Sequence, residues 1–323
     1  MLRKLTLVYV MAWLLWTISA GAQNVHKHVL TTPEPLHGAE QGEALTKRVF
    51  YQLDPAGLAA RGLLVLLPGR GEPARDVFHA TRLAQEAAQR GFVVMVLGLN
   101  DRISLDAVGI RFLDDAVGQV VRQRPALARQ VVVGGFSAGG QLAFAYVETL
   151  VRDSTQRPWR VRAVLGVDPP LDLVEHWQRA QYHLAKQDCP ALRAGDQRIL
   201  DELTHELGGG PAQVPGPYLA RSAFVRSDSV GGNARWLRAL PVRLYCEPDL
   251  AFWQQQYCSA LQPADLNAYG ATAFIACLQR QGNTQAHYFQ TTGKGFQGKR
   301  RMPHSWSIVD AAECAAWLQR CLE

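Results

Sequence analysis

The sequence predicts an α/β fold, with a mostly parallel, doubly wound sheet flanked by helices. Short apolar runs bounded by turn residues recur along the chain, and such runs are typical of strands buried on both faces. Helical patterns separate these runs, and this alternation favours a parallel sheet with helices on both of its faces. With 323 residues, 48% of them hydrophobic, the chain is long enough to bury a full core.

The order of the elements shows one interruption. We expect strands at residues 48–53, 63–67, 92–97, 131–133, 161–167, 242–245 and 286–290. We expect helices at residues 78–90, 106–122, 141–151 and 310–321. Residues 169–240 contain helical patterns at 174–186 and 196–207 but no central strand. They predict a helical insertion, which either covers a site as a lid or only adds surface.

The N-terminus has the pattern of a secretory signal. Arg3 and Lys4 precede an apolar run over residues 5–18, and residues 20–22 are Ala-Gly-Ala. About 14 apolar residues are fewer than the roughly 20 that span a bilayer. We therefore expect residues 1–22 to be a signal peptide cleaved before Gln23. The protein would be exported, periplasmic or secreted, without stable membrane insertion afterwards. Residues 23–44 form an N-terminal segment, and residues 45–323 form the main domain.

Charge and cysteine content exclude several classes of function. The formal net charge of +6 is scattered rather than clustered, which argues against a nucleic-acid partner. No nucleotide-binding glycine loop or HExxH motif is present, so we expect no cofactor and no catalytic metal. Export permits disulfides, and the six cysteines allow 15 full pairings, among which the sequence does not choose.

The motif that carries chemistry is Gly135-Phe136-Ser137-Ala138-Gly139, which joins a predicted strand to a predicted helix. A serine at the tip of such a turn is held in a strained backbone conformation, and glycines two residues before and after it avoid collisions. The turn points the hydroxyl away from the sheet. The amide of Ala138, at the start of the helix, can stabilise the negative oxygen of a tetrahedral intermediate.

A nucleophilic serine needs a base, and the base needs an orienting acid. The strand at 242–245 runs into two candidate acids, Glu247 and Asp249. Two histidines follow them. His287 lies within a strand pattern and is expected to be structural. His304 lies in a loop between the last strand and the last helix, where it can reach the serine, and is the predicted base.

A second oxyanion donor is expected from the loop after the strand at 63–67. This loop reads Pro68-Gly69-Arg70-Gly71, and its glycines allow the backbone to curl toward the serine. The amide of Arg70 is the first candidate donor and that of Gly71 the second.

From about residue 45 to its end, the chain resembles the α/β-hydrolase superfamily. The resemblance rests on the loop at 68–71, the motif at 135–139, Glu247-Pro248-Asp249 and Pro303-His304-Ser305-Trp306, in the order found in that family. It implies a nucleophile at Ser137, a base at His304 and an acid at Asp249, with Glu247 as the alternative acid. The oxyanion loop departs from the family by lacking a His-Gly start.

We therefore expect an exported serine hydrolase acting on a small-molecule ester, less readily on an amide, through an acyl-enzyme. Phe136, Trp253 and Trp306 are candidate substrate contacts, although such aromatic residues also fill cores. The basic segment at 293–301 fits either an anionic substrate or a solvated loop. The alternatives are a non-catalytic binding protein and a serine peptidase, both of the same fold.

Overall fold

The computed structural model describes residues 24–31, 47–99, 101–186 and 188–323. The predicted signal peptide, residues 1–22, lies outside the described residues. Within the described ranges, no helix combines the length and the apolar character needed to cross a bilayer.

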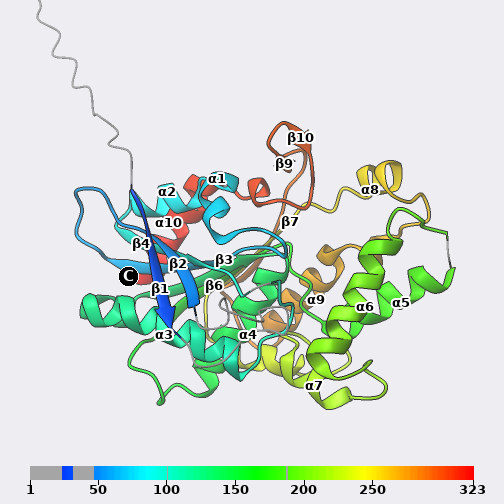
Figure 1. Cartoon of the computed structure of the whole chain (residues 1–323), viewed down its shortest axis with the longest axis horizontal. Coiled ribbons are helices and arrows are strands. Elements are labelled where there is room, and N and C mark those ends of the chain that lie inside the picture. Colours follow the sequence, from blue (N-terminus) through cyan, green and yellow to red (C-terminus); the bar gives the residue numbers. More distant parts are fainter. Residues whose placement is uncertain (1–23, 32–46, 100, 187) are drawn as a thin grey trace, which may run out of the picture.

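An eight-stranded sheet forms the centre of the molecule (Figure 1), in the order β1-β2-β4-β3-β5-β6-β7-β8. The strands from β4 through β8 in this order run parallel, whereas β2 runs antiparallel to both of its neighbours, β1 and β4, near one edge. The predicted fold class is therefore confirmed. The strands are β1 (Val25–Thr31), β2 (Lys47–Leu53), β3 (Gly62–Leu67), β4 (Phe92–Leu97), β5 (Val131–Phe136), β6 (Val161–Val167), β7 (Val242–Cys246) and β8 (Ala286–Gln290).

Strand β1 was not expected. It lies in the segment predicted to precede the main domain, yet it pairs with β2 along its whole length. The sheet therefore begins at Val25 rather than after residue 45. Three polar residues in a row, at 26–28, interrupt β1, and most of its side chains are exposed, so its sequence lacks the continuous apolar run that marks the central strands.

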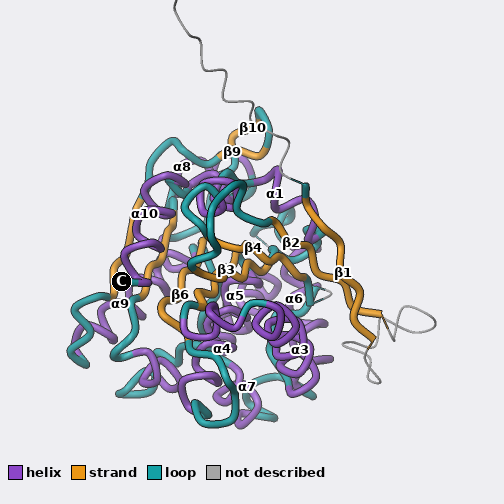
Figure 2. The backbone as a smooth tube through the Cα atoms, turned by 90° about the vertical axis from the view of Figure 1, so that its left-hand side faces the viewer, coloured by secondary structure: helices purple, strands orange, loops and turns teal. Residues whose placement is uncertain are grey.

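Helices cover both faces of the sheet. One face packs against α1 (Val77–Ala80), α2 (Leu83–Ala88) and α10 (Ala311–Leu322). The other packs against α3 (Ala107–Gln123), α4 (Ala138–Arg152) and α9 (Asn267–Arg280). In Figure 2, α3 and α4 lie below the strands and α1 above them. Alternate residues of each strand enter the two cores. In β3, Leu63 and Val65 face α3 and α4, whereas Leu64 and Leu66 face α2 and α10.

The single helix expected at residues 78–90 is broken into α1 and α2. Thr81 has an extended backbone, and its hydroxyl accepts a hydrogen bond from the Leu83 amide at 3.1 Å. A threonine side chain can satisfy the backbone in this way without a continuous helix, which explains the break.

The insertion between β6 and β7 is helical, as predicted. It contains α5 (Leu173–Lys186), α6 (Arg193–Leu207), α7 (Pro215–Arg221) and a 3-10 turn at Gly232–Leu237. Helix α6 ends at Gly208, whose φ of 89° suits glycine.

After β7 come α8 (Leu250–Gln256) and α9. The short strands β9 (Phe296–Gln297) and β10 (Arg300–Arg301) precede His304.

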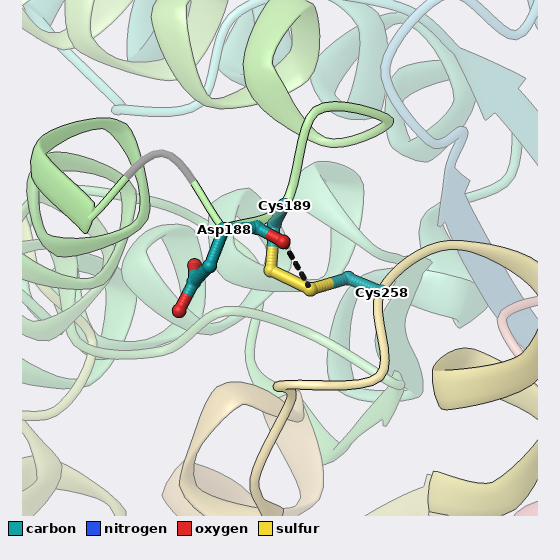
Figure 3. Close-up of side chains that lie close together, drawn as sticks. All are labelled: Asp188, Cys189 and Cys258. Carbon is teal, nitrogen blue, oxygen red and sulfur yellow. Dashed lines mark hydrogen bonds between the residues drawn. A yellow bond between two sulfur atoms is a disulfide. The ribbon is translucent and has the colours of Figure 1, made fainter.

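A disulfide ties the insertion to the rest of the domain. Cys189, between α5 and α6, is bonded to Cys258, just after α8 (Figure 3). In a chain-entropy description, a loop of this sequence separation of 69 restricts the unfolded chain by about 4 kcal/mol. The carboxylate of Asp188 lies beside the two sulfurs. Because the sulfurs are bonded to each other, they are not the thiolates that a metal would need.

Candidate active site

Ser137 stands at the strained turn between β5 and α4. Its φ of 52° and ψ of −124° are unusual for a residue with a side chain. A Cβ added at Gly135 would lie 2.2 Å from the Gly139 carbonyl oxygen, and one added at Gly139 would lie 2.1 Å from that of Pro68. Both glycines of the motif are therefore required by the close approach of backbone segments, as the sequence predicted.

Three polar side chains form a chain of hydrogen bonds at the carboxyl end of the sheet. The Ser137 Oγ lies 2.9 Å from Nε2 of His304, and Nδ1 of His304 lies 2.6 Å from Oδ2 of Asp168. A carboxylate can only accept, so the proton of the neutral imidazole sits on Nδ1. Nε2 is then free to accept the serine proton. This arrangement is suited to activating the hydroxyl as a nucleophile.

Asp168 directly follows β6 and is fixed by its own backbone. Its amide donates to the Tyr245 carbonyl at 2.8 Å, and its carbonyl accepts from the Asn267 side chain at 2.9 Å. Its φ of 49° is one of the few positive values outside glycine among the described residues. The backbone is therefore held in an unfavourable conformation that directs the carboxylate toward His304.

The prediction that Asp249 orients His304 is wrong. The Asp249 side chain accepts from the Phe252 amide at 3.0 Å, which caps the start of α8, and from Arg301 at 2.8 Å. These contacts direct it away from the histidine. The alternative acid, Glu247, is also not the partner of His304.

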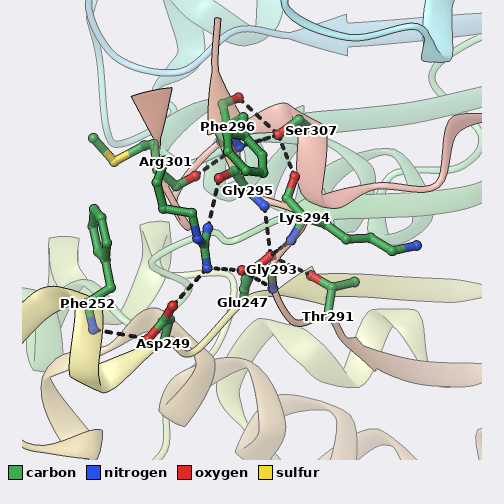
Figure 4. A network of polar contacts seen from close by, with 12 residues as sticks. Glu247, Asp249, Phe252, Thr291, Gly293, Lys294, Gly295, Phe296, Arg301 and Ser307 are labelled. Carbon is green, nitrogen blue, oxygen red and sulfur yellow. Dashed lines mark hydrogen bonds and ion pairs between the residues drawn. The ribbon is translucent and has the colours of Figure 1, made fainter. Parts of the chain in front are cut away.

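Glu247 instead organises the loop that leads to His304 (Figure 4). Its carboxylate accepts hydrogen bonds from the amides of Gly293, Lys294 and Gly295 at 2.7, 2.9 and 2.9 Å. Arg301 also donates to it, and the side chain is only 1% exposed. Part of the basic segment at 293–301 is therefore used inside the protein, to neutralise a buried carboxylate.

A signal for Asp168 was present in the sequence. The strand at 161–167 was predicted with its observed end, and Asp168 is the residue that follows it. The predicted acids, Glu247 and Asp249, both follow the next strand, at 242–245. Neighbouring parallel strands end at the same edge of a sheet, so both positions were open on physical grounds.

Of the two oxyanion donors predicted in the loop after β3, one already has a hydrogen-bond acceptor. The amide of Gly71 donates to the Asp101 carboxylate at 2.6 Å, so it is already used. The amides of Gly69 and Glu72 also have acceptors within this loop. Arg70 remains the candidate donor from this loop. The amide of Ala138 is the first of α4, where no carbonyl of the helix precedes it.

A cavity of about 290 Å³ opens beside Ser137 and His304. Side chains from the insertion form much of its wall, including His176, Arg179 and His183 of α5. An apolar part is lined by Ile103, Leu192, Ile199, Trp253, Leu261 and Leu266. The helical insertion thus lies against the candidate site. Its movement as a lid stays a prediction.

Of the three predicted aromatic contacts, only Trp253 lines this cavity. Trp306 is 2% exposed, and its Nε1 donates to the Glu72 carboxylate at 2.9 Å. Phe136 packs between Trp306 and His304, with ring centroids 5.6 and 4.6 Å away. Phe136 thus contacts the imidazole directly, and Trp306 packs against Phe136. Burial raises the pKa of Glu72, although its hydrogen bonds oppose this shift.

The histidines of α5 differ in charge. His183 lies between Asp196 and Asp265, 3.3 and 3.1 Å away, and its polar contacts with these two carboxylates raise its pKa to about 9. In contrast, burial lowers the pKa of His176 well below its ordinary value, and the positive charge of Arg179 adds to this. At neutral pH, His183 is therefore a cation and His176 is neutral.

No protein-family model matches the sequence, and the search of curated proteins gives no match either. Solved structures do match the fold. Carboxyl esterase 2 from Tuber melanosporum aligns with a TM-score of 0.58 at 14% identity, covering 95% of this chain and 89% of that one. Mycobacterium tuberculosis MPT51 aligns with 0.57 at 13% identity, covering 94% and 100%. Brefeldin A esterase, a bacterial homologue of human hormone sensitive lipase, aligns with 0.54 at 18% identity, covering 94% and 80%.

Proposed function

Because the chain has the α/β-hydrolase fold, we propose that it is a serine hydrolase that cleaves carboxylic esters. The observation that carries this proposal is the hydrogen-bonded series Ser137, His304 and Asp168 beside a cavity large enough for a small molecule. The esterases among the matching structures support the choice of an ester.

In the proposed mechanism, Ser137 attacks the ester carbonyl while Nε2 of His304 takes its proton. Asp168 holds the imidazole in the required tautomer and stabilises the imidazolium that forms. The amides of Ala138 and Arg70 donate to the oxygen that becomes negative. His304 then returns the proton to the leaving alcohol, and water cleaves the acyl-enzyme with His304 again acting as base.

A fluorophosphonate probe tests this proposal directly. The probe should label the folded protein at Ser137, and Ser137→Ala should abolish both the labelling and the hydrolysis of p-nitrophenyl esters. Folded protein that neither reacts with the probe nor hydrolyses any ester would favour a non-catalytic binding protein. A chain that cleaves peptides in preference to esters would favour the peptidase.

We further propose that the protein is exported, with residues 1–22 removed. The charged start, the apolar run and the small residues at 20–22 support this, and so does the disulfide between Cys189 and Cys258. N-terminal sequencing of protein recovered from outside the cytoplasm should begin at Gln23. A mature chain that retains Met1 would contradict the proposal.

A further inference from the structure

Arg179 of α5 is a cation that has no carboxylate against it. Its Nη2 donates to Nδ1 of His176 at 2.7 Å and to the Asn267 side-chain oxygen at 3.2 Å. Both acceptors are neutral, because His176 keeps its proton only on Nε2 when Nδ1 accepts from a guanidinium. Burial lowers the pKa of Arg179, and nearby carboxylates oppose this shift, so the group stays charged.

Other arginines with small exposed fractions are paired differently. Arg102, Arg157 and Arg243 each have a carboxylate within hydrogen-bonding distance, from Asp106, Asp114 and Glu313. Within the described ranges, no carboxylate oxygen lies within ion-pair distance of Arg179. A half-buried guanidinium with only neutral contacts is costly unless an anion completes it.

The carboxylates that surround Arg179 at longer range already have partners. Asp196 and Asp265 contact His183, whereas Asp168 contacts His304. Glu175, on the same helix, is paired with Arg226. None of these pairings directs a carboxylate to Arg179, so its remaining donors are available to a ligand.

The position of Arg179 connects it to the candidate nucleophile. It lines the cavity that contains Ser137 and also an adjoining cavity of about 360 Å³ bordered by Tyr182 and Tyr269. His176, Asn267 and Asp265 are shared by both cavities. The guanidinium thus stands at the boundary between them, where a molecule bound at Ser137 can reach it.

We propose that Arg179 binds a carboxylate carried by the ester substrate, an inference that rests on the proposed esterase function. The planar guanidinium matches a carboxylate with two parallel hydrogen bonds. A singly charged group fits better than a phosphate dianion, because Asp168, Asp196 and Asp265 stand close enough to repel additional negative charge. The apolar wall at Leu261 and Trp253 would receive the uncharged part of the substrate.

Matched pairs of esters test this inference. Mono-p-nitrophenyl adipate and p-nitrophenyl hexanoate have acyl chains of equal length, and only the adipate carries a carboxylate. A second pair tests a carboxylate on the alcohol part of the ester: 4-acetoxybenzoate is compared with its uncharged methyl ester. One carboxylated ester should exceed its uncharged partner in kcat/KM by about tenfold or more, mainly through a lower KM.

Variants assign this preference to a residue. Arg179→Gln should remove most of the ratio between charged and uncharged esters, and Arg179→Lys should retain part of it. Arg193→Gln is the matched control, because Arg193 is an exposed arginine of α6 in the same insertion and lines neither of the two cavities. It should keep the wild-type ratio. Thermal unfolding of each variant checks that it is folded.

Calorimetric titration separates this inference from the proposed function. The Ser137→Ala protein should bind the preferred carboxylated ester about tenfold more tightly than its uncharged partner, and Arg179→Gln in the same background should abolish the difference. Equal binding of both esters would overturn the anion site even if esters are hydrolysed. Preferential binding of the carboxylated ester without hydrolysis by the native protein would keep the site and reject the enzyme.

Discussion

Two carboxylates at the carboxyl ends of neighbouring parallel strands have opposite surroundings. Asp168 follows β6 and faces an imidazole, whereas Glu247 follows β7 and faces three backbone amides and Arg301. Asp168 is 14% exposed beside the cavity, and Glu247 is 1% exposed beneath the loop before His304. The same residue chemistry at equivalent strand ends thus has two different roles.

The two carboxylates differ in how many of their acceptor sites are still free for a further hydrogen bond. The acceptor sites of Glu247 are filled by fixed donors, so it stabilises the loop and has no capacity left for an imidazole. Asp168 keeps an oxygen for Nδ1 of His304 while its backbone is held by Tyr245 and Asn267. The acid that orients the histidine is therefore recognised by a free acceptor oxygen. Its position at a strand end is not sufficient to identify it.

The largest expected effect comes from replacing Asp168. Asp168→Asn should lower kcat by about 10³- to 10⁴-fold, because the amide donates toward Nδ1 and favours the wrong tautomer of His304. The free energy of unfolding should change by only about 1 kcal/mol. Ester hydrolysis under saturating substrate and urea unfolding measure the two quantities.

Asp249→Asn is the matched control for this variant. Its carboxylate caps α8 and contacts Arg301, so the substitution should leave kcat within about fivefold of the native value. If Asp249→Asn were the more damaging of the two, the roles assigned to the strand ends would have to be exchanged.

Replacing Glu247 should give the reverse profile. Glu247→Gln keeps the shape but places an NH₂ group among amide donors and leaves Arg301 without its buried partner. Unfolding should become easier by about 2–4 kcal/mol. The kcat should fall by only about tenfold, through a less well-held His304. A variant with native stability but no activity would contradict this division between the two carboxylates.

Much of the fold followed from local pattern. Strands β3, β4 and β5 are runs without a polar residue, and α5 and α6 of the insertion have clear helical spacing, so neither depends on distant partners for its recognition. Strand β1 and the break at Thr81 depend instead on pairing with β2 and on a single side-chain hydrogen bond. Patterns of hydrophobicity do not contain that information.

The sequence predicted those parts of the site that are determined by residues close together in the chain. Gly135 and Gly139 mark the turn of Ser137, and the loop position of His304 follows from the order of elements. Which of Asp168, Glu247 and Asp249 orients His304 is not determined by residues close to them in the chain. It depends on amides from 293–295 and on Arg301, which are about 50 residues away from Glu247 in the chain. Arg179 was missed for the same reason, since an unpaired charge is recognised only once its neighbours are placed.

A second histidine in the same cavity contacts aspartates, and it extends the comparison because no nucleophile adjoins it. His183 lies between Asp196 and Asp265, and its pKa is raised to about 9. The folded protein therefore binds a proton here that the unfolded chain releases near pH 6.5. This contribution to stability is complete below about pH 6.5 and is lost as the pH rises through about 9.

Urea unfolding between pH 6 and pH 9.5 measures this contribution. The native protein should lose about 1–3 kcal/mol of unfolding free energy over this range through His183. His183→Gln should be less stable at pH 6 and should lose correspondingly less, because its side chain does not titrate between the two aspartates. Subtracting the unfolding free energies of the two proteins at each pH removes the contribution of other titrating groups, such as the buried thiols of Cys246 and Cys314. Parallel pH profiles for the two proteins would show that His183 is not held as a cation, and that carboxylates in this cavity orient histidines without charging them.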